Sequence, residues 1–233
     1  LLSETIKRKI REVKRFLGNV EQDIRDIQSI DIESYFMRKI GSGFSDSTKN
    51  IALSALKELF FALKRHDMIL VNPFEKTEIY FKEKSGLKVI LSEQEVVKFL
   101  ESIETLTGLG FRDRSIFELM YVTGMRVSEV SALNVSDIDF SLNEVFIREA
   151  KGHKDRVVPL GSVAKNYLEK WIKKYRSYFL GKKKNEALFL SGKALRLSRS
   201  SIRQLFKKYL KLSGVEKKAT PHSLRHSCAT HLL

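Results

Sequence analysis

Four side chains at paired spacings have the types needed to bind a phosphate group or to orient a side chain that binds one. Arg126 and Glu129 lie three residues apart, and so do His222 and Arg225 near the end of the chain. Three-residue spacing puts two side chains on one face of a helix, so His222 and Arg225 could reach one phosphate together. A fifth candidate, Lys151, lies beside a glycine at the exit of a predicted strand.

Each of these signals is weak when taken alone. A His-x-x-Arg pair is common on helices, and Arg126 with Glu129 could be an ordinary surface ion pair. An isolated lysine in a hairpin turn is usually a solvated charge. Only a fold that gathers all three segments would turn them into a site.

The net charge indicates a polyanionic partner. The 233 residues carry 43 Lys and Arg against 28 Asp and Glu, a formal charge of +15. Residues 151–218 hold 20 of the basic side chains and four acidic ones. Nucleic acid is the favoured partner, although thermophile and ribosomal proteins also carry many lysines on solvated faces. We expect no membrane association and a soluble, cytoplasmic protein, because no apolar run approaches the roughly 20 residues of a spanning helix.

The elements that must position these side chains fall into two groups. Apolar residues recur with helical spacing at 6–17 and at 51–63, and a short helix is expected after Asp31. Residues 1–80 are therefore predicted to form a small helical domain. A charged stretch without a clear period follows, so we place a linker at 81–90 and a second domain at 91–233.

The second domain is predicted to be mainly helical with a small antiparallel β-sheet. Ser92 and Glu95 form the pattern of a capping box, and Gly124 is placed to end a helix that begins near Arg112. Alternating apolar residues predict a β-hairpin whose turn carries Lys151. Helices are expected again at 163–178, at 198–212 and from 221 to the end.

Three motifs, in this order, resemble the Xer-type tyrosine recombinases of the phage integrase family. They are Thr-Gly-Met-Arg-Val-Ser-Glu (123–129), Ala-Lys-Gly-His-Lys-Asp-Arg-Val-Val-Pro-Leu (150–160) and Pro-His-Ser-Leu-Arg-His-Ser-Cys-Ala-Thr-His-Leu-Leu (221–233). The resemblance covers essentially the whole chain and implies a core-binding domain followed by a catalytic domain. Ala150 and Cys228 depart mildly from the family pattern, which often has a glycine and an aromatic residue there.

The resemblance assigns a role to each candidate side chain. Arg126 and Arg225 would bind the nonbridging oxygens, where negative charge builds as a tyrosine attacks a DNA phosphodiester. Lys151 would protonate the leaving 5′ oxygen, and His222 would assist proton handling. Glu129 would orient Arg126. Because a 3′-phosphotyrosyl link keeps the energy of the broken bond, neither ATP nor a metal cofactor is expected.

The end of the chain departs from the family pattern. Relatives continue past the His-x-x-Arg helix to the nucleophilic tyrosine, whereas all seven tyrosines here precede that helix. We therefore expect a C-terminally truncated catalytic domain, with the nucleophile beyond residue 233. These 233 residues should bind double-stranded DNA without cutting it. The full-length enzyme is expected to act as a tetramer at a specific recombination site, and the truncated chain to be a monomer.

The helix expected at 198–212 is the candidate for entering the DNA major groove. Its first two turns carry side chains that can contact bases or phosphates, namely Arg199, Ser200, Arg203 and Gln204. A basic solvated face above an apolar inner face has the same pattern, and one helix can serve both purposes.

Other interpretations remain open. Resolution of chromosome or plasmid dimers is favoured over phage or transposon integration, and over a type IB topoisomerase. A regulator that binds DNA without catalysis is the alternative from a different class. Two metal sites are disfavoured: a zinc site made of His222, His226, Cys228 and His231, and a two-metal site at Asp137 and Asp139.

Overall fold

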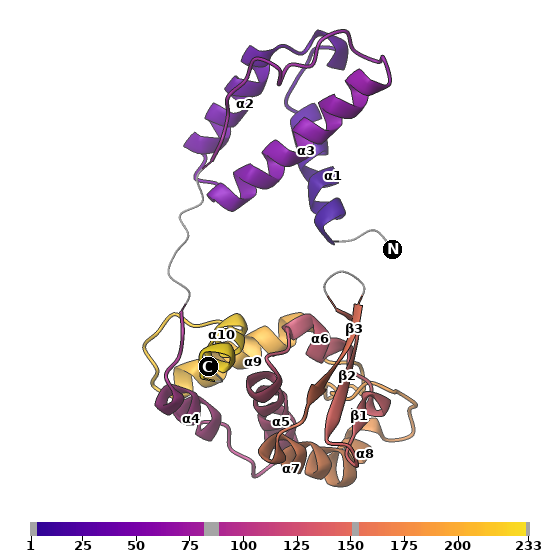
Figure 1. Ribbon diagram of the computed structural model, residues 1–233, viewed down its shortest axis with the longest axis vertical. Coiled ribbons are helices and arrows are strands. Elements are labelled where there is room, and N and C mark those ends of the chain that lie inside the picture. The colour runs from indigo at the N-terminus through magenta and orange to yellow at the C-terminus, as the bar shows by residue number, and fades with distance from the viewer. Residues whose placement is uncertain (1–3, 82–88, 151–153, 232–233) are drawn as a thin grey trace. The chain divides into compact units, whose positions relative to one another are not determined.

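The computed structural model describes residues 4–81, 89–150 and 154–231. The chain divides into two compact units, Leu1–Gly86 and Leu87–Leu233 (Figure 1). The division falls within the stretch expected to be a linker. In the described residues no helix is long and apolar enough to cross a membrane.

Unit 1 is a bundle of three helices, as its apolar periodicity predicts. They are α1 (Glu4–Leu17), α2 (Ser29–Gly41) and α3 (Asp46–Arg65), with a short 3-10 turn, η1 (Ile24–Asp26), between the first two. Ser45 caps α3 by accepting a hydrogen bond from the backbone N–H of Thr48. Five large side chains fill the core almost without exposure: Phe16, Ile32, Phe36, Leu56 and Phe60.

Of the apolar stripe expected along α1 at positions 6, 10, 13 and 17, Val13 packs against the core, but the rest of the inner face differs. Ile6, Ile10 and Leu17 remain about two-fifths exposed, and the buried residues are Glu12 and Phe16. Phe16 packs edge-on against Tyr35 of α2, and Glu12 forms an ion pair with the buried Lys39, also of α2. The aromatic ring and the ion pair rotate the helix away from the face that periodicity alone predicts.

Unit 2 is mainly helical with a small antiparallel sheet, which confirms the predicted fold class. Its helices before the sheet are α4 (Glu93–Glu101), α5 (Gly108–Thr123) and α6 (Val127–Ala132), followed by the 3-10 turn η2 (Val135–Asp137). After the sheet come α7 (Ser162–Lys170), the π-helical turn η3 (Trp171–Tyr175), α8 (Arg176–Leu180), α9 (Arg199–Leu212) and α10 (Pro221–His231). Helix α5 runs through the middle of the unit (Figure 1).

The sheet has three antiparallel strands in the order β1-β2-β3. They are β1 (Ile138–Asp139), β2 (Glu144–Ala150) and β3 (Lys154–Pro159). Val145 and Ile147 of β2 are buried, so this face of the predicted hairpin lies on the core. Strand β1 is too short to leave a periodic signal and was not expected.

Helix α9 closes the core of unit 2 with an aromatic cluster. The rings of Phe99 and Phe206 lie 4.8 Å apart between centroids, and those of Phe99 and Phe117 lie 5.2 Å apart. These rings join α4, α5 and α9. Each such contact stabilises the fold by about 1 kcal/mol beyond the area it buries. Helix α5, whose C-cap Gly124 belongs to the first predicted motif, is thereby held on a packed core.

Candidate active site

A sharp turn between α5 and α6 brings the first predicted motif into position. Gly124 ends α5 in the left-handed conformation, with φ of 59°, where a glycine is favoured. Arg126 is the N-cap residue of α6, and the Glu129 side chain accepts a hydrogen bond from its backbone N–H at 2.8 Å. This capping box ties the predicted pair to the start of the helix.

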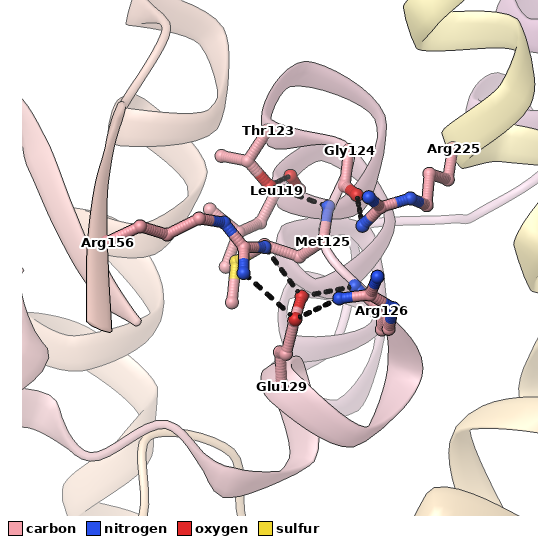
Figure 2. A network of polar contacts seen from close by, with 8 residues as sticks. All are labelled: Leu119, Thr123, Gly124, Met125, Arg126, Glu129, Arg156 and Arg225. Atoms are coloured by element: carbon pink, nitrogen blue, oxygen red, sulfur yellow. Dashed lines mark hydrogen bonds and ion pairs between the residues drawn. The ribbon is translucent and has the colours of Figure 1, made fainter. Parts of the chain in front are cut away.

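Glu129 lies between two guanidinium groups (Figure 2). Its Oε1 accepts a hydrogen bond from Nη1 of Arg126 at 2.8 Å. Arg156 of β3 donates from Nη1 to Oε1 at 3.0 Å and from Nη2 to Oε2 at 2.8 Å. The carboxylate is therefore shared by α6 and the hairpin.

The environment of Glu129 keeps its carboxylate charged. Burial opposes the charged form, but hydrogen bonds from Arg156 and from the backbone and side chain of Arg126 outweigh it, lowering the pKa of the carboxyl from 4.5 to about 2. At neutral pH the side chain is a fixed negative charge that two cations share.

Arg225 reaches the same turn from α10. Its Nη1 donates a hydrogen bond to the carbonyl oxygen of Gly124 at 2.6 Å, and Figure 2 shows it on the same side of the turn as Arg126. Burial first, and then the positive charge of Arg126, lower the pKa of Arg225 from its ordinary value. Two arginines that repel each other across a turn would be stabilised by an anion placed between them.

His222 lies at the exposed rim of this cluster, one helical turn before Arg225. Burial, and then the positive charges of His226, Arg203, Arg225 and Arg126, lower the pKa of its imidazole. A lowered pKa favours the neutral ring, which can accept a proton. The structure thus brings together Arg126, Glu129, His222 and Arg225. Lys151 lies outside the described residues.

The four predicted DNA-contacting residues of α9 are all exposed, near its N-terminal end. They are Arg199, Ser200, Arg203 and Gln204. Ile202 and Phe206 of the same helix are buried, so α9 has the two faces that its sequence predicts. Contact with DNA remains a prediction.

Sequence reasoning missed Arg156, although it belongs to the second quoted motif. Arg156 is directly opposite Ile147 in the β2–β3 register, and Ile147 is buried. Opposite residues of an antiparallel pair point to the same face, so Arg156 points toward the core side of the hairpin. A charged residue at an inward position of a strand is the signal that could have revealed it, because such a charge requires a partner.

The alternative metal ligands have other partners. Asp137 accepts a hydrogen bond from Arg148 at 2.9 Å, and Asp139 accepts one from the backbone of Ser141 at 2.8 Å. No group of three or more His, Cys, Asp or Glu side chains suited to a metal ion occurs in the described stretches.

Comparison with known proteins identifies the family of the chain. Residues 90–233 match the model of the phage integrase family. A tyrosine recombinase XerD of Oceanobacillus iheyensis is 36% identical over 230 residues, which are 94% of this chain and 76% of the relative. A XerD of Listeria monocytogenes is 33% identical over 242 residues, with 100% and 80% covered.

Solved structures show the same fold. The XerA recombinase matches with a TM-score of 0.55 and 27% identity over 98% of this chain and 76% of that one. The Tn1549 transposon integrase, solved with circular intermediate DNA, matches with a TM-score of 0.78 and 20% identity over 99% and 81%. The chain belongs to the phage integrase family and, within it, to the Xer-type tyrosine recombinases.

Proposed function

We propose that this chain binds duplex DNA at a specific site and holds one backbone phosphate for attack by a tyrosine. The observation that carries the proposal is the pair of guanidiniums from α6 and α10 at one turn. Glu129 holds Arg126 at 2.8 Å, and the Gly124 carbonyl holds Arg225 at 2.6 Å. Each arginine keeps further N–H groups that could donate to nonbridging phosphate oxygens.

The chemistry proposed for this site is transfer of a phosphoryl group from one oxygen to another. The tyrosine oxygen forms a bond to phosphorus, and the bond from phosphorus to the 5′ oxygen breaks. Arg126 and Arg225 stabilise the charge on the nonbridging oxygens, and Lys151 gives its proton to the departing 5′ oxygen. Neutral His222 assists proton movement at the pocket. A 5′ hydroxyl then reverses the steps and reseals a strand.

None of the seven tyrosines is assigned as the nucleophile. Tyr121 hydrogen-bonds His231 at 2.9 Å, and Tyr209 donates to the buried Asp113 at 2.8 Å. We propose that the polypeptide of these 233 residues binds DNA without forming a covalent adduct. Incubation with a nicked suicide duplex, followed by denaturing electrophoresis, should show no shifted band. A trapped protein-DNA adduct would refute the proposal.

Unit 1 offers a second place for a phosphate. A cavity of about 230 Å³ is lined by three arginines of α1, Arg8, Arg11 and Arg15, together with Glu12, Phe44, Thr48 and Ile51. Glu12 already pairs with Arg15 at 2.7 Å, which leaves Arg8 and Arg11 as the cations available to a phosphate. The three arginines are exposed. We propose that this surface grips the DNA backbone while α9 of unit 2 enters a groove.

The proposed biological role is resolution of chromosome or plasmid dimers, by a tetramer acting on two aligned DNA sites. The likeness to XerD proteins supports this role. Integration is the second candidate, favoured by the match to a transposon integrase with a TM-score of 0.78. DNA affinity of Arg126→Ala and Arg225→Ala tests the shared pocket. Each substitution should weaken binding, and unchanged affinity in both would contradict the proposal.

A further inference from the structure

We infer that Arg156 is a positioning residue. By binding the carboxylate of Glu129, Arg156 leaves the guanidinium of Arg126 able to bind a phosphate. The inference rests on the proposed phosphate-binding role of Arg126. It extends that role to a residue on the β2–β3 hairpin, on the far side of Glu129 from Arg126 (Figure 2).

The hydrogen bonds divide the carboxylate unequally between the two arginines. Arg156 meets both oxygens through two guanidinium nitrogens, at 3.0 Å and 2.8 Å. Arg126 donates one guanidinium hydrogen bond, from Nη1 at 2.8 Å, and a second bond from its backbone N–H. The two-pronged guanidinium partner of Glu129 is therefore Arg156. In the described part of the chain, no acceptor is recorded for Nε or Nη2 of Arg126.

The buried carboxylate of Glu129 determines how much positive charge Arg126 has available for a phosphate. The side chain of Glu129 is only 6% exposed, and a carboxylate so placed needs a close cation. Without Arg156, Arg126 would be the guanidinium left to pair with it. A two-pronged pair between Arg126 and Glu129 would cancel the positive charge of Arg126. A DNA phosphate would then have to compete with Glu129.

A purely structural role for Arg156 predicts something different. In that case the ion pair only fastens β3 to α6, and substituting Glu129 as well would weaken phosphate binding further. If Arg156 shares the charge, removing the carboxylate from the Arg156 variant should restore phosphate binding. Glutamine at position 129 can still accept the hydrogen bond from the Arg126 backbone, so the capping box can be kept.

The test follows inorganic phosphate binding by NMR at constant ionic strength. The Nε–Hε signals of Arg126 and Arg225 in the ¹⁵N-labelled 233-residue protein report where phosphate binds. The variants are Arg156→Gln and Arg156→Gln with Glu129→Gln. The matched control is Arg148→Gln, which removes a charge from the same hairpin at an arginine paired with Asp137 at 2.9 Å.

Arg156→Gln should weaken phosphate binding about tenfold, the size of effect expected when a charge-assisted hydrogen bond is lost to a competitor. The double variant should return to within about twofold of wild type, and Arg148→Gln should stay within about twofold of it. Circular dichroism confirms that each variant is folded. Should Arg156→Gln not fold, Arg156→Lys takes its place, with a loss of about threefold that Glu129→Gln again reverses.

Unchanged affinity in a folded Arg156→Gln protein, or a further loss in the double variant, would overturn the inference. Arg225→Ala separates this failure from failure of the proposed function. If Arg225→Ala weakens phosphate binding and Arg156→Gln does not, only the role of Arg156 is wrong. If Arg225→Ala leaves phosphate affinity unchanged, the phosphate pocket itself is wrong.

Discussion

The acid stability of unit 2 should depend strongly on the carboxyl group of Glu129. The folded pKa of Glu129 is lowered from 4.5 to about 2, so its stabilising effect is present above pH 5 and is lost as pH falls toward 2. The effect is on the order of 2–3 kcal/mol. Urea unfolding of Glu129→Gln should therefore show a weaker loss of stability between pH 5 and pH 3 than wild type. An equally steep acid limb in both proteins would show that Glu129 is not the group responsible.

Gly124 should resist substitution because of its backbone. Its φ of 59° is in the left-handed region, and an added Cβ would have ordinary contact distances of 3.6 Å to Cys228 and 3.8 Å to Arg225. Gly124→Ala should therefore cost about 1–2 kcal/mol from strain alone. Gly192, which has open space around it and no positive φ, is the control. Urea unfolding that shows equal stability for both alanine variants would contradict the strain argument.

The residues of the site could be predicted to different degrees. Arg126, Glu129, His222 and Arg225 carry motif spacings. The structure places Arg126, Glu129 and Arg225 at one turn, with His222 one helical turn before Arg225 in α10. Arg156 could not be assigned, because its role depends on the strand register and on a partner 27 residues away. The Gly124 carbonyl was also missed, since a backbone acceptor has no signature in side-chain types.

Among the elements, helix α9 was the most predictable. Its capping serine and its two faces are local properties, and the helix begins one residue after Ser198. The helix expected at 163–178 is present as an uninterrupted helical run from Ser162 to Leu180, made of α7, an unexpected π-helical turn and α8. Trp171 opens that turn, fully buried, and donates a hydrogen bond to the Leu188 carbonyl at 2.9 Å. A tertiary contact of this kind cannot be inferred from local periodicity.

Two residues of α9 should affect DNA binding in different ways. If Arg203 neutralises a phosphate, Arg203→Ala should reduce the slope of log affinity against log salt by about 0.9. Gln204→Ala should leave this slope unchanged and relax the preference for particular bases. Fluorescence anisotropy across a salt series measures the slope, and the same titration with duplexes of altered sequence measures the base preference. Lys98→Ala, an exposed charge on α4, is the control. An identical slope for Arg203→Ala and wild type would remove Arg203 from the phosphate contacts.

The charge of the whole molecule favours DNA binding and opposes self-association without it. A formal charge of +15 on 233 residues means that copies of the chain repel one another at low salt. We expect a monomer in solution by multi-angle light scattering, also at moderate salt. A stable tetramer in the absence of DNA would show that the protein has an assembly surface strong enough to overcome this repulsion.

The central claim is that Arg126 and Arg225 converge on one DNA phosphate. The most direct measurement is a crystal structure of the protein bound to a duplex selected from random sequence by binding. We predict one backbone phosphate whose nonbridging oxygens accept hydrogen bonds from both guanidiniums, with His222 beside it. Two arginines that contact different phosphates, or that face solvent in the complex, would contradict the claim.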